Sequence, residues 1–360
     1  MNWDGPGQGE RLLLLAPHPD DETLSAGGVL QRALARGGRA TVAIASDGEN
    51  NPWTQRLVER RWRVGPDDSR RFGRRRRAEA LAALSELGIP AADAVFLGLP
   101  DQAMTGLLLS GSETAIGDLA SLIDGRRTTL LIAPSSFDLH PDHSALAVLT
   151  RLAVSRLAPE RRPRLLSYLI HRSRRMRIAA PEEGPNALRF EPGPDERERK
   201  RRAILCHATQ LSVHRRKFLS FADRPEIFFT QEPAGDGDGL HPVRRVRLGP
   251  DGLRLEVELH PRLGAFGRPT LHLATGALGE RRSLGLDLRW RCGRAEVKDL
   301  STDRTTGGAA LRGDRRGGIV EVPAQALPAS GPLYVKLERR FGFFDEGGWL
   351  EVDDPRLRQA

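Results

Sequence analysis

The sequence is poor in cysteine, in aromatic residues and in long apolar runs, and each shortage excludes a class of protein. Its 360 residues include only Cys206 and Cys292, too few for a disulfide-bonded scaffold or a zinc site built from thiolates. Aromatic residues make up 5% of the chain, and without zinc-finger or RNP-like spacing the sequence does not predict nucleic-acid binding. Residues 12–16, the longest apolar run near the N-terminus, are far fewer than the roughly 20 that span a bilayer. We therefore expect a cytoplasmic, enzyme-sized protein without a secretory signal or transmembrane segment.

Lysine is also scarce, so arginine supplies nearly all of the positive charge. Lys and Arg number 56 against 47 Asp and Glu, a net charge of +9, and only four of the 56 are lysines. Residues 151–217 alone hold 18 basic and 7 acidic side chains. Such a basic segment can attract an anionic partner, but an arginine-biased composition spread over a solvated surface explains it equally well.

The first half of the chain alternates short apolar segments with longer amphipathic ones. Strands bounded by Gly, Pro or Asp are predicted at residues 12–16, 40–45, 94–97, 130–133 and 165–170. Helical spacing predicts helices at residues 24–36, 74–87, 113–124 and 142–157, and a later one at 196–209. This alternation is typical of an α/β fold: a Rossmann-like, doubly wound, mostly parallel sheet with helices on both faces.

The pattern changes after about residue 232, where a Gly/Asp linker follows at residues 235–239. Apolar and polar residues then alternate at period two in segments 253–259, 270–274, 284–290, 318–322 and 333–337. Turn residues separate these segments, as in an antiparallel β-sandwich of roughly 100 residues. Because single cores stop growing at roughly 250–300 residues, we expect two domains, an α/β domain over 1–233 and an accessory β-sandwich over 234–360.

Two clusters of His and Asp carry the strongest chemical signal. Pro17-His18-Pro19-Asp20-Asp21-Glu22 follows the first predicted strand, and His140-Pro141-Asp142-His143 follows the fourth. His-Pro also occurs at His241 and His260, but without adjacent acids, so the acids and the strand-end location distinguish the first two clusters. Ligands of open α/β sheets bind beyond the carboxyl ends of the strands. The two clusters are therefore expected to meet there.

Their composition fits a catalytic metal. A catalytic zinc ion needs three ligands from His and Asp or Glu, and an open position for water. His18 and Asp21, three residues apart on a turn stiffened by proline, can supply two ligands, and His143 can supply the third. Zn²⁺ is the expected cofactor, although iron or another divalent metal suits the same ligands.

The remaining members of the two clusters suit supporting roles. Asp20 is expected beside the metal-bound water as a general base. His140 can donate to a developing oxyanion, and Asp142 can fix the orientation of a histidine. Glu22 is expected to support the ligands from behind rather than to bind the metal.

Three further segments accompany these clusters in a fixed order. They are Ser46-Asp47-Gly48-Glu49, then Arg76-Arg77-Ala78-Glu79 followed by Leu87-Gly88, and Lys200-x-x-Ala203-x-x-x-His207-x-Thr209-Gln210. Together the five motifs resemble the PIG-L/LmbE-like zinc-dependent N-acetylglucosaminyl deacetylases over about residues 10–230. The chain departs from the family at Pro17, Ser46 and Thr209, where alanine, threonine and serine are usual, and none of these changes removes a ligand.

The resemblance implies a role for each of five residues. It implies Zn²⁺ held by His18, Asp21 and His143, with Asp20 as the base and His140 stabilising the tetrahedral intermediate. The implied reaction is hydrolysis of the acetamide of an N-acetylated amino sugar, free or attached to an anionic or lipid carrier, which yields acetate and a free amine.

Three other residues carry weaker predictions with two interpretations each. The resemblance points Arg76 into the pocket to bind a substrate hydroxyl or phosphate, whereas the alternative is a solvated helix start. His207 either closes the pocket and contacts substrate or is a structural histidine of a late helix. Asp47 either caps its loop or supports the site.

Residues 50–72 are expected to form a long loop at the catalytic edge. Such loops usually carry function or are disordered. Because the segment contains Trp53 and Trp62, we expect it to contact substrate by stacking tryptophan on sugar.

Two other functions stay open. A carbohydrate-binding protein would bind sugar with the β-sandwich, through Trp290 and Trp349, and its α/β domain would be an inactive scaffold. The complete set of metal ligands argues against this alternative. A metal-dependent phosphoester hydrolase would use similar ligands, usually with two metals about 3.5–4 Å apart, and we count ligands for one.

Overall fold

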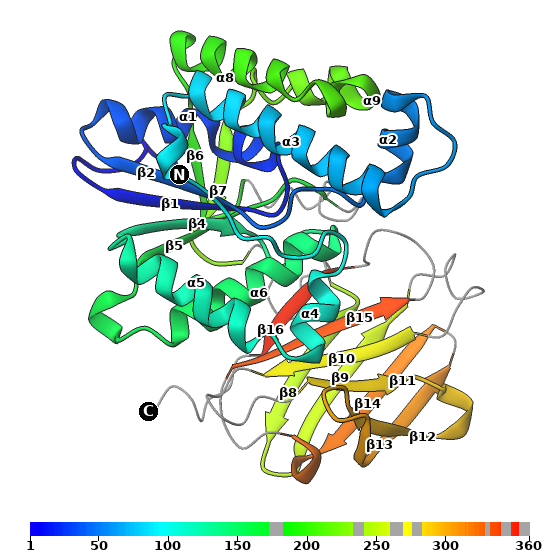
Figure 1. Cartoon of the computed structure of the whole chain (residues 1–360). Coiled ribbons are helices and arrows are strands. Elements are labelled where there is room, and N and C mark those ends of the chain that lie inside the picture. The colour runs from blue at the N-terminus through cyan, green and yellow to red at the C-terminus, as the bar shows by residue number, and fades with distance from the viewer. Residues whose placement is uncertain are drawn as a thin grey trace.

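The computed structural model describes residues 1–172, 183–232, 241–259, 269–275, 283–314, 316–327, 332–339 and 347–352. The described residues form two sheets, one covered by helices on both faces and one made of antiparallel strands (Figure 1). None of the helices among them is both long and apolar enough to cross a membrane. The predicted linker at 235–239 and the predicted boundary between 233 and 234 lie outside the described residues, so the domain boundary stays a prediction.

The first sheet has the strand order β3-β2-β1-β4-β5-β7-β6. Its parallel strands are β1 (Arg11–Ala16), β2 (Arg39–Ile44), β3 (Ala94–Phe96), β4 (Leu130–Pro134) and β5 (Arg164–Tyr168). The antiparallel strands β7 (Glu226–Phe229) and β6 (Ala187–Phe190) complete one edge. The predicted mostly parallel α/β sheet is therefore confirmed.

Helices cover both faces of this sheet (Figure 1). One face carries α1 (Asp21–Ala35), α3 (Pro66–Glu86) and α8 (Pro194–Cys206), with α2 (Pro52–Glu59) and α9 (Ala208–Leu219) beyond them. The other face carries α4 (Met104–Ser110), α5 (Glu113–Gly125) and α6 (Pro141–Ser155). In β1, Leu12 and Leu14 pack toward α1, whereas Leu13 and Leu15 pack toward α5 and α6. A strand buried on both faces reads as a continuous apolar run, which explains the sequence of β1.

The expectation of a long loop at residues 50–72 is wrong. The segment contains α2 and the first turns of α3, and each helix has a proline in its first turn. Proline is favoured there because its missing N–H has no partner within the helix. The Asn51 side chain caps α2 by accepting a hydrogen bond from Thr54 N at 3.2 Å.

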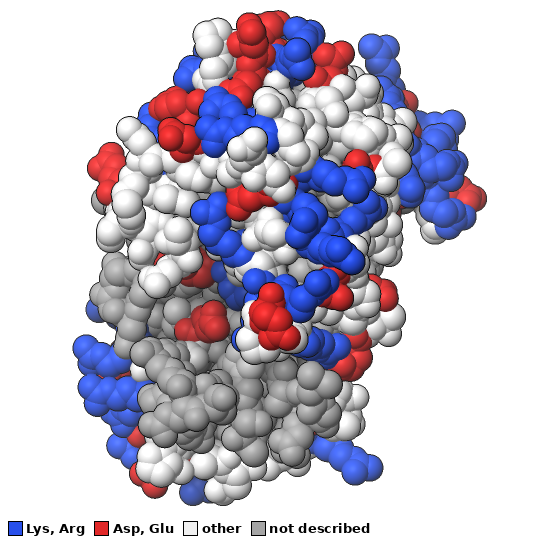
Figure 2. Space-filling view, turned by 90° about the vertical axis from the view of Figure 1, so that its left-hand side faces the viewer, with Lys and Arg blue, Asp and Glu red and all other residues white. Residues whose placement is uncertain are grey.

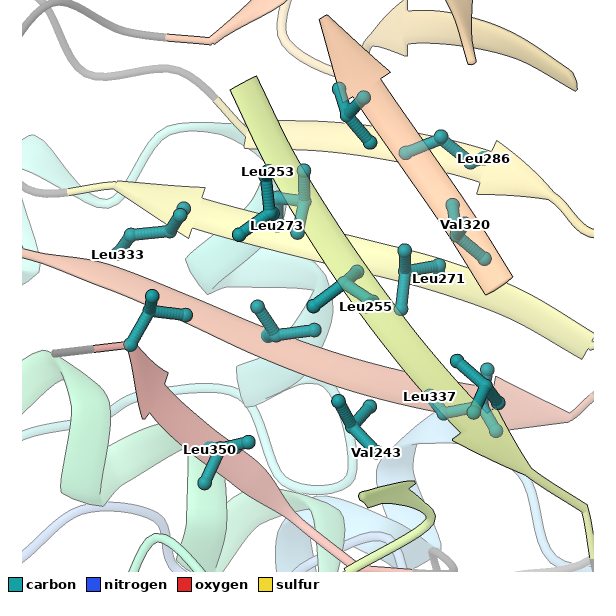
Figure 3. Packing of buried hydrophobic residues seen from close by; sticks show 14 of the residues in the cluster. Val243, Leu253, Leu255, Leu271, Leu273, Leu286, Val320, Leu333, Leu337 and Leu350 are labelled. Atoms are coloured by element: carbon teal, nitrogen blue, oxygen red, sulfur yellow. The ribbon is translucent and has the colours of Figure 1, made fainter. Parts of the chain in front are cut away.

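The second sheet has nine antiparallel strands in the order β16-β15-β10-β11-β12-β13-β14-β9-β8. They are β8 (Val243–Gly249), β9 (Gly252–Glu258), β10 (Pro269–Thr275), β11 (Ser283–Asp287), β12 (Arg294–Asp299), β13 (Arg304–Asp314), β14 (Gly317–Pro323), β15 (Leu333–Arg339) and β16 (Trp349–Val352). The terminal strands β8 and β16 contact each other, so the sheet curls around one core. Figure 3 shows leucine and valine side chains filling the space between its crossing strands. The predicted antiparallel β-rich region is confirmed.

The two sheets are joined by a shared hydrophobic core. Tyr334 and Trp349 of the second sheet belong to the cluster that also contains the apolar faces of α5 and α6. Trp349 N donates a hydrogen bond to Ser136 O at 2.7 Å. The preceding residue must be glycine, because Gly348 has φ +71° and a Cβ at this position would clash with the same carbonyl oxygen. The second sheet therefore supports the loop that leads into His140 and His143.

The positive charge of the chain is largely interleaved with acidic groups. Figure 2 shows one face of the molecule, on which basic and acidic side chains are intermingled. Within the basic segment 151–217, Arg161 pairs with Asp124 at 2.6 Å and Arg202 with Glu86 at 2.9 Å. Such exposed pairs contribute little to stability, but they place acidic groups beside the arginines of this segment that the structure describes.

A buried ion pair supports a kink in α1. Ala26 has non-helical φ/ψ and marks the kink. Beyond it, the backbone N–H groups of Gly28 and Val29 donate hydrogen bonds to the Glu226 carboxylate at 2.6 and 2.9 Å. Lys200 Nζ lies 2.6 Å from the same carboxylate, and both side chains are buried. Since Lys200 also passes over Gly27, a larger residue at 27 would meet the lysine stem.

Replacing Glu226 by alanine is expected to lower the free energy of unfolding by about 3–5 kcal/mol, because it leaves Lys200 charged and buried without its partner. Chemical denaturation measures the change. Glu198→Ala is the matched control on α8, because Glu198 is an exposed acid beside Arg201 and Arg202. It should change the free energy of unfolding by less than about 0.5 kcal/mol. Equal losses in the two variants would contradict the role given to Glu226.

Candidate active site

Loops that follow parallel strands of the first sheet meet at one end of it. They bring together His18, Asp20 and Asp21 after β1, Asp101 after β3, His140 and His143 after β4, and His171 after β5. A cavity of about 200 Å³ opens among them. Of the predicted site residues, the cavity is lined by His18, Asp20, Asp21, Arg76 and His140. His143 and Asp142 are fully buried next to it.

The three predicted metal ligands lie in contact with one another. Asp21 Oδ2 is 3.1 Å from His18 Nδ1 and 3.1 Å from His143 Nε2, and the two imidazole rings are 5.3 Å apart between centroids. Ligand atoms around a tetrahedral zinc ion lie about 3.4 Å apart, so Asp21 Oδ2 lies at a suitable distance from a ring nitrogen of each histidine. Both ring nitrogens of His143 are buried without a hydrogen bond of acceptable geometry. A buried ring nitrogen without such a hydrogen bond fits a metal ligand.

The charge around these histidines favours a cation. Burial alone would lower the pKa of His143, but Asp21 and Asp138 on its two sides raise that pKa to about 9. Burial likewise opposes the charge on His18, yet Asp101, Asp142 and Asp21 hold the pKa of His18 well above its ordinary value. The carboxylates thus create a negative potential at the two imidazoles, which attracts either protons or a metal ion.

Three sets of three side chains among the described residues have metal-ligating atoms within 4.8 Å of one another. They are His18, His140 and His143; Asp138, His143 and His171; and His18, Asp101 and Asp142. Each set includes His18 or His143. The predicted set of His18, Asp21 and His143 is not one of these three, although Asp21 contacts each of its two histidines.

Asp20 occupies a strained position beside the ligands. Its φ of 126° is one that residues other than glycine seldom adopt. Its N–H donates to Glu22 Oε2 at 2.8 Å, and its Oδ2 lies 3.1 Å from Arg76 Nη2. Burial and the adjacent Asp21 raise the pKa of Asp20 to about 7, even though Arg76 acts in the opposite direction. A carboxyl group with such a pKa can exchange a proton near neutral pH.

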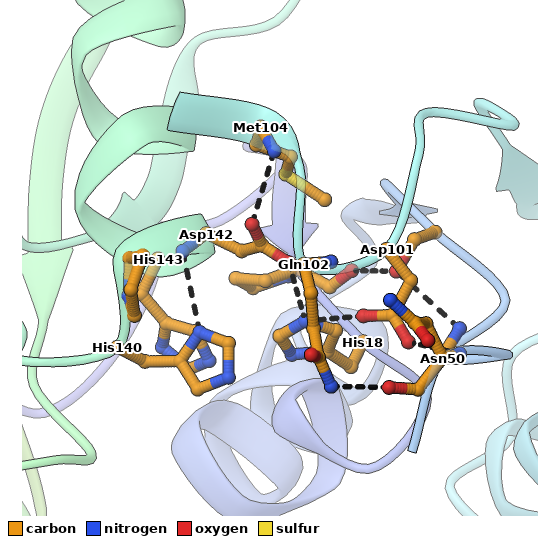
Figure 4. A network of polar contacts seen from close by, with 12 residues as sticks. His18, Asn50, Asp101, Gln102, Met104, His140, Asp142 and His143 are labelled. Atoms are coloured by element: carbon orange, nitrogen blue, oxygen red, sulfur yellow. Dashed lines mark hydrogen bonds and ion pairs between the residues drawn. The ribbon is translucent and has the colours of Figure 1, made fainter. Parts of the chain in front are cut away.

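His140 is held as a neutral hydrogen-bond donor. Its Nδ1 accepts from Asp142 N at 3.2 Å, at the start of α6, which leaves the proton on Nε2 (Figure 4). Burial, with the positive charges of His18 and His143, keeps the pKa of His140 well below its usual value. This tautomer can donate a hydrogen bond from Nε2.

Asp142 connects two loops of the site. Its Oδ2 accepts from Gln102 N at 2.6 Å and lies 3.2 Å from His18 Nε2, while its Oδ1 accepts from Met104 N at 3.1 Å (Figure 4). The buried carboxylate therefore fixes the segment after β3 against His18. Its contacts fit the role of orienting a histidine.

Arg76 reaches the cavity from α3 and binds the turns around it. Its guanidinium donates to Gly48 O at 2.9 Å and Pro19 O at 2.8 Å as well as to Asp20. These bonds hold the strained Asp20 turn in place. Asp47, beside Gly48, is not among the described residues that line the cavity.

His207 and Glu22 form a buried pair behind the Asp20 turn. His207 Nε2 lies 3.2 Å from Glu22 Oε1, and the Thr23 hydroxyl donates to the same oxygen at 2.8 Å. His207 stands at the break between α8 and α9, where the helix predicted at 196–209 divides in two. It is not among the described cavity-lining residues, so a direct contact with substrate stays a prediction.

Three acidic or histidine residues of the site, Asp101, Asp138 and His171, were not predicted from the sequence. Asp101 Oδ1 lies 3.3 Å from His18 Nε2, and Asp138 accepts from the backbone N–H groups of His140, Ile170 and His171 at 2.9–3.1 Å. A signal was available, because each of these residues follows a predicted parallel strand at the same edge of the sheet.

Comparison with known proteins agrees with this geometry. Residues 13–154, which run from β1 through α6, match the family model described as PIG-L, GlcNAc-PI de-N-acetylase. Over these residues the chain is similar to the PIG-L family. The resemblance stated from the motifs is therefore confirmed, and both His/Asp clusters fall inside the matched PIG-L region.

Relatives of this PIG-L region are named as deacetylases. The 1D-myo-inositol 2-acetamido-2-deoxy-alpha-D-glucopyranoside deacetylase of Kribbella flavida is 32% identical over 155 residues, 37% of this chain and 50% of that protein. The protein of the same name from Rhodococcus erythropolis is 29% identical over 245 residues, 57% of this chain and 82% of that protein. A conserved protein from Thermus thermophilus has a similar structure, with TM-score 0.45, 24% identity, and coverage of 63% of this chain and 96% of that one. The chain spans about half the length of the first curated relatives that it matches.

Proposed function

We propose that this chain is a metal-dependent deacetylase that hydrolyses the acetamide of an N-acetylated amino sugar. The observation that supports this most is the contact of Asp21 with both His18 and His143, beside Asp20 and His140 at one cavity. The deacetylase names of the relatives agree with it. We also infer a cytoplasmic location, as the composition predicts.

His18, Asp21 and His143 would hold the metal ion, and zinc is the default for two imidazoles and a carboxylate. The ring nitrogens of His143, which are buried and face carboxylates without a hydrogen bond of acceptable geometry, support this donor set. When bound, such an ion supplies Lewis acidity, which polarises the acetyl carbonyl and acidifies the attacking water.

The other side chains would move and hold the protons of the reaction. Asp20 accepts the proton of the attacking water as the new C–O bond forms, and Arg76 keeps its carboxylate in place. His140 donates a hydrogen bond from Nε2 to the oxygen on which negative charge develops. When the C–N bond breaks, Asp20 passes its proton to the leaving nitrogen, so water and amide become acetic acid and amine, which are released as acetate and ammonium.

The test is acetate release by the metal-loaded protein from free, nucleotide-linked, lipid-linked and polymeric N-acetylated sugars. The proposal expects acetate and a free amine in equal amounts from at least one of these classes. Absence of acetate from all four classes, with stoichiometric metal bound, would overturn it.

A second cavity suggests that the substrate carries an anionic group beyond the sugar. The cavity measures about 630 Å³ and shares Leu24, Ile170, His171, Lys217 and Phe221 with the first cavity, so the two adjoin. Beyond these residues its charged lining consists of Arg172, Arg189, Arg224 and Glu226. Glu226 is paired with Lys200 and Arg189 with Glu191, so Arg172, Lys217 and Arg224 supply the excess of positive charge in the cavity lining. A phosphate or carboxylate on the aglycone would suit this lining.

The double variant Lys217→Gln/Arg224→Gln is expected to lower the preference for anionic over neutral conjugates. The ratio of the two kcat/KM values should fall about tenfold, because two cations facing the anion are lost. Matched conjugates with and without a phosphate group supply the measurement. Arg215→Gln/Arg216→Gln, two exposed residues of α9 that are not among the cavity lining, should leave the ratio unchanged. An unchanged ratio in the first variant would contradict an anionic subsite.

A phosphoester hydrolase is the second candidate, because Asp138, His143 and His171 form another donor set next to the first. The two sets share His143, which favours one metal rather than two. Two metal ions per chain, together with phosphate release from a phosphoester, would favour this candidate over the deacetylase.

A further inference from the structure

The α2 helix exposes its two largest apolar side chains, Trp53 and Leu57, and buries two polar ones, Thr54 and Gln55. Trp53 and Leu57 are 75% and 58% exposed, and Trp62, just after the helix, is 84% exposed. Thr54 and Gln55 are buried, and Gln55 Nε2 donates to Asp68 O at 2.7 Å. A helix at the surface of a soluble protein normally buries its apolar face. The reversed arrangement leaves large apolar side chains facing water.

Positive charge surrounds these side chains. Residues 52–64 contain Arg56, Arg60, Arg61 and Arg63 and a single acid, Glu59. Arg71 engages Glu59 at 2.5 Å, and Arg61 pairs with Asp68 at 3.0 Å. The Arg56 guanidinium lies 5.0 Å above the Trp53 ring and donates to Trp62 O at 3.0 Å. Arg56 therefore ties the two tryptophan-bearing segments into one surface. We call residues 53–63 the Trp-Arg surface.

The Trp-Arg surface lies beside the mouth of the catalytic cavity. Asn51, which caps α2, lines that cavity, and α2 packs against α9, whose Gln210 and Lys217 line it as well. Figure 1 shows α2 next to α9 at the outer end of the helical layer. A molecule bound to this surface would be close to the entrance of the site.

We propose that the Trp-Arg surface docks onto an anionic lipid bilayer. Tryptophan is favoured at the level of lipid headgroups, where its ring is partly apolar and its N–H stays hydrated. Arginine beside it gains from the negative surface potential of phospholipid. A basic helix whose apolar side chains project outward suits shallow insertion into the headgroup region. This inference goes beyond the proposed catalysis, since docking needs neither the metal nor the sugar.

Cosedimentation of the full chain with vesicles tests the docking. The protein should bind vesicles of phosphatidylcholine with phosphatidylglycerol and bind pure phosphatidylcholine much less, with affinity falling as salt is raised. Trp53→Ser/Trp62→Ser should weaken binding at least tenfold. Arg60→Gln/Arg63→Gln should weaken it about thirtyfold at low salt.

Matched controls distinguish binding through the Trp-Arg surface from nonspecific binding of exposed apolar or charged side chains to vesicles. Leu205→Ser removes an exposed apolar side chain from α8, and Arg291→Gln/Arg294→Gln removes two exposed charges, one in the turn before β12 and one at the start of β12. Both controls should bind vesicles like the unmodified protein. The proposal is overturned if the unmodified protein binds neither kind of vesicle, or if the tryptophan variant binds as well as the controls. It is also overturned if sedimentation velocity shows a dimer that the tryptophan variant abolishes, because the surface would then join two copies of the chain.

Discussion

Replacing Asp20 by asparagine is expected to lower kcat for acetate release by about 10²–10⁴-fold while metal stays bound. The amide keeps the shape of the side chain and can still accept from Arg76, but it cannot take the proton of the attacking water. Asparagine also tolerates a positive φ better than most residues, so the strained turn at φ 126° should survive. Steady-state kinetics, with metal analysis of the same sample, measure both effects.

Asp67→Asn is the control for Asp20, because Asp67 is an exposed acid in the first turn of α3 that pairs with Arg70. It should keep full activity. If Asp20→Asn retained more than about a tenth of the original kcat, Asp20 would not be the base. If it lost the metal, the role of Asp20 would be structural instead.

Replacing Asp21 by asparagine is expected to weaken metal binding by more than about a hundredfold, a larger effect than the 10–100-fold typical of residues that only orient a ligand. The change removes the charge of the one carboxylate that contacts both His18 and His143. Activity should fall in proportion to the metal lost. Competition with a chelator of known affinity measures the change.

Two variants distinguish this donor set from its neighbours. Asp101→Asn alters the set formed with His18 and Asp142, and its loss of metal affinity should be smaller than that of Asp21→Asn. Asp124→Asn changes an exposed acid paired with Arg161 and should leave metal binding unchanged. If Asp101→Asn released the metal and Asp21→Asn did not, the ligand assignment would be wrong.

The location of the site could be predicted because it depends on topology rather than on fine packing. The strands before His18 and His140 are short apolar runs bounded by polar residues, which identifies them without homologues. Once these strands are neighbours in a parallel sheet, their carboxyl ends lie at one edge. The pairing of β1 with β4 then accounts for the contact between His18 and His143, although 124 residues separate them.

Other parts of the site could not be predicted because they rest on single residues or on tertiary contacts. Asp101, Asp138 and His171 stand outside the two clusters, and only the folded chain shows which atoms they approach. The strained φ of Asp20 follows from bonds to Glu22 and Arg76, and no local pattern predicts it.

The wrong prediction of a loop at α2 and the failure to predict strands β6 and β7 of the first sheet have local causes. The polar sequence of residues 50–72, rich in arginine and tryptophan, predicted a loop, whereas the structure forms α2 and the start of α3 there, each with a proline in its first turn. Strands β6 and β7 have four residues each, too few for a periodic signal. The contact of Trp349 with the loop at Ser136 joins distant parts of the chain, and alternation within a strand cannot predict it.

The most direct test is a crystal structure of the metal-loaded protein with anomalous diffraction data on both sides of the zinc absorption edge. We expect one anomalous peak per chain at this site, about 2.0–2.2 Å from His18 Nδ1, His143 Nε2 and a carboxylate oxygen of Asp21. A peak held by Asp138 and His171, or by Asp101 and Asp142, without Asp21 would contradict the ligand assignment. A crystal grown with excess zinc and showing no peak there would contradict the metal centre itself.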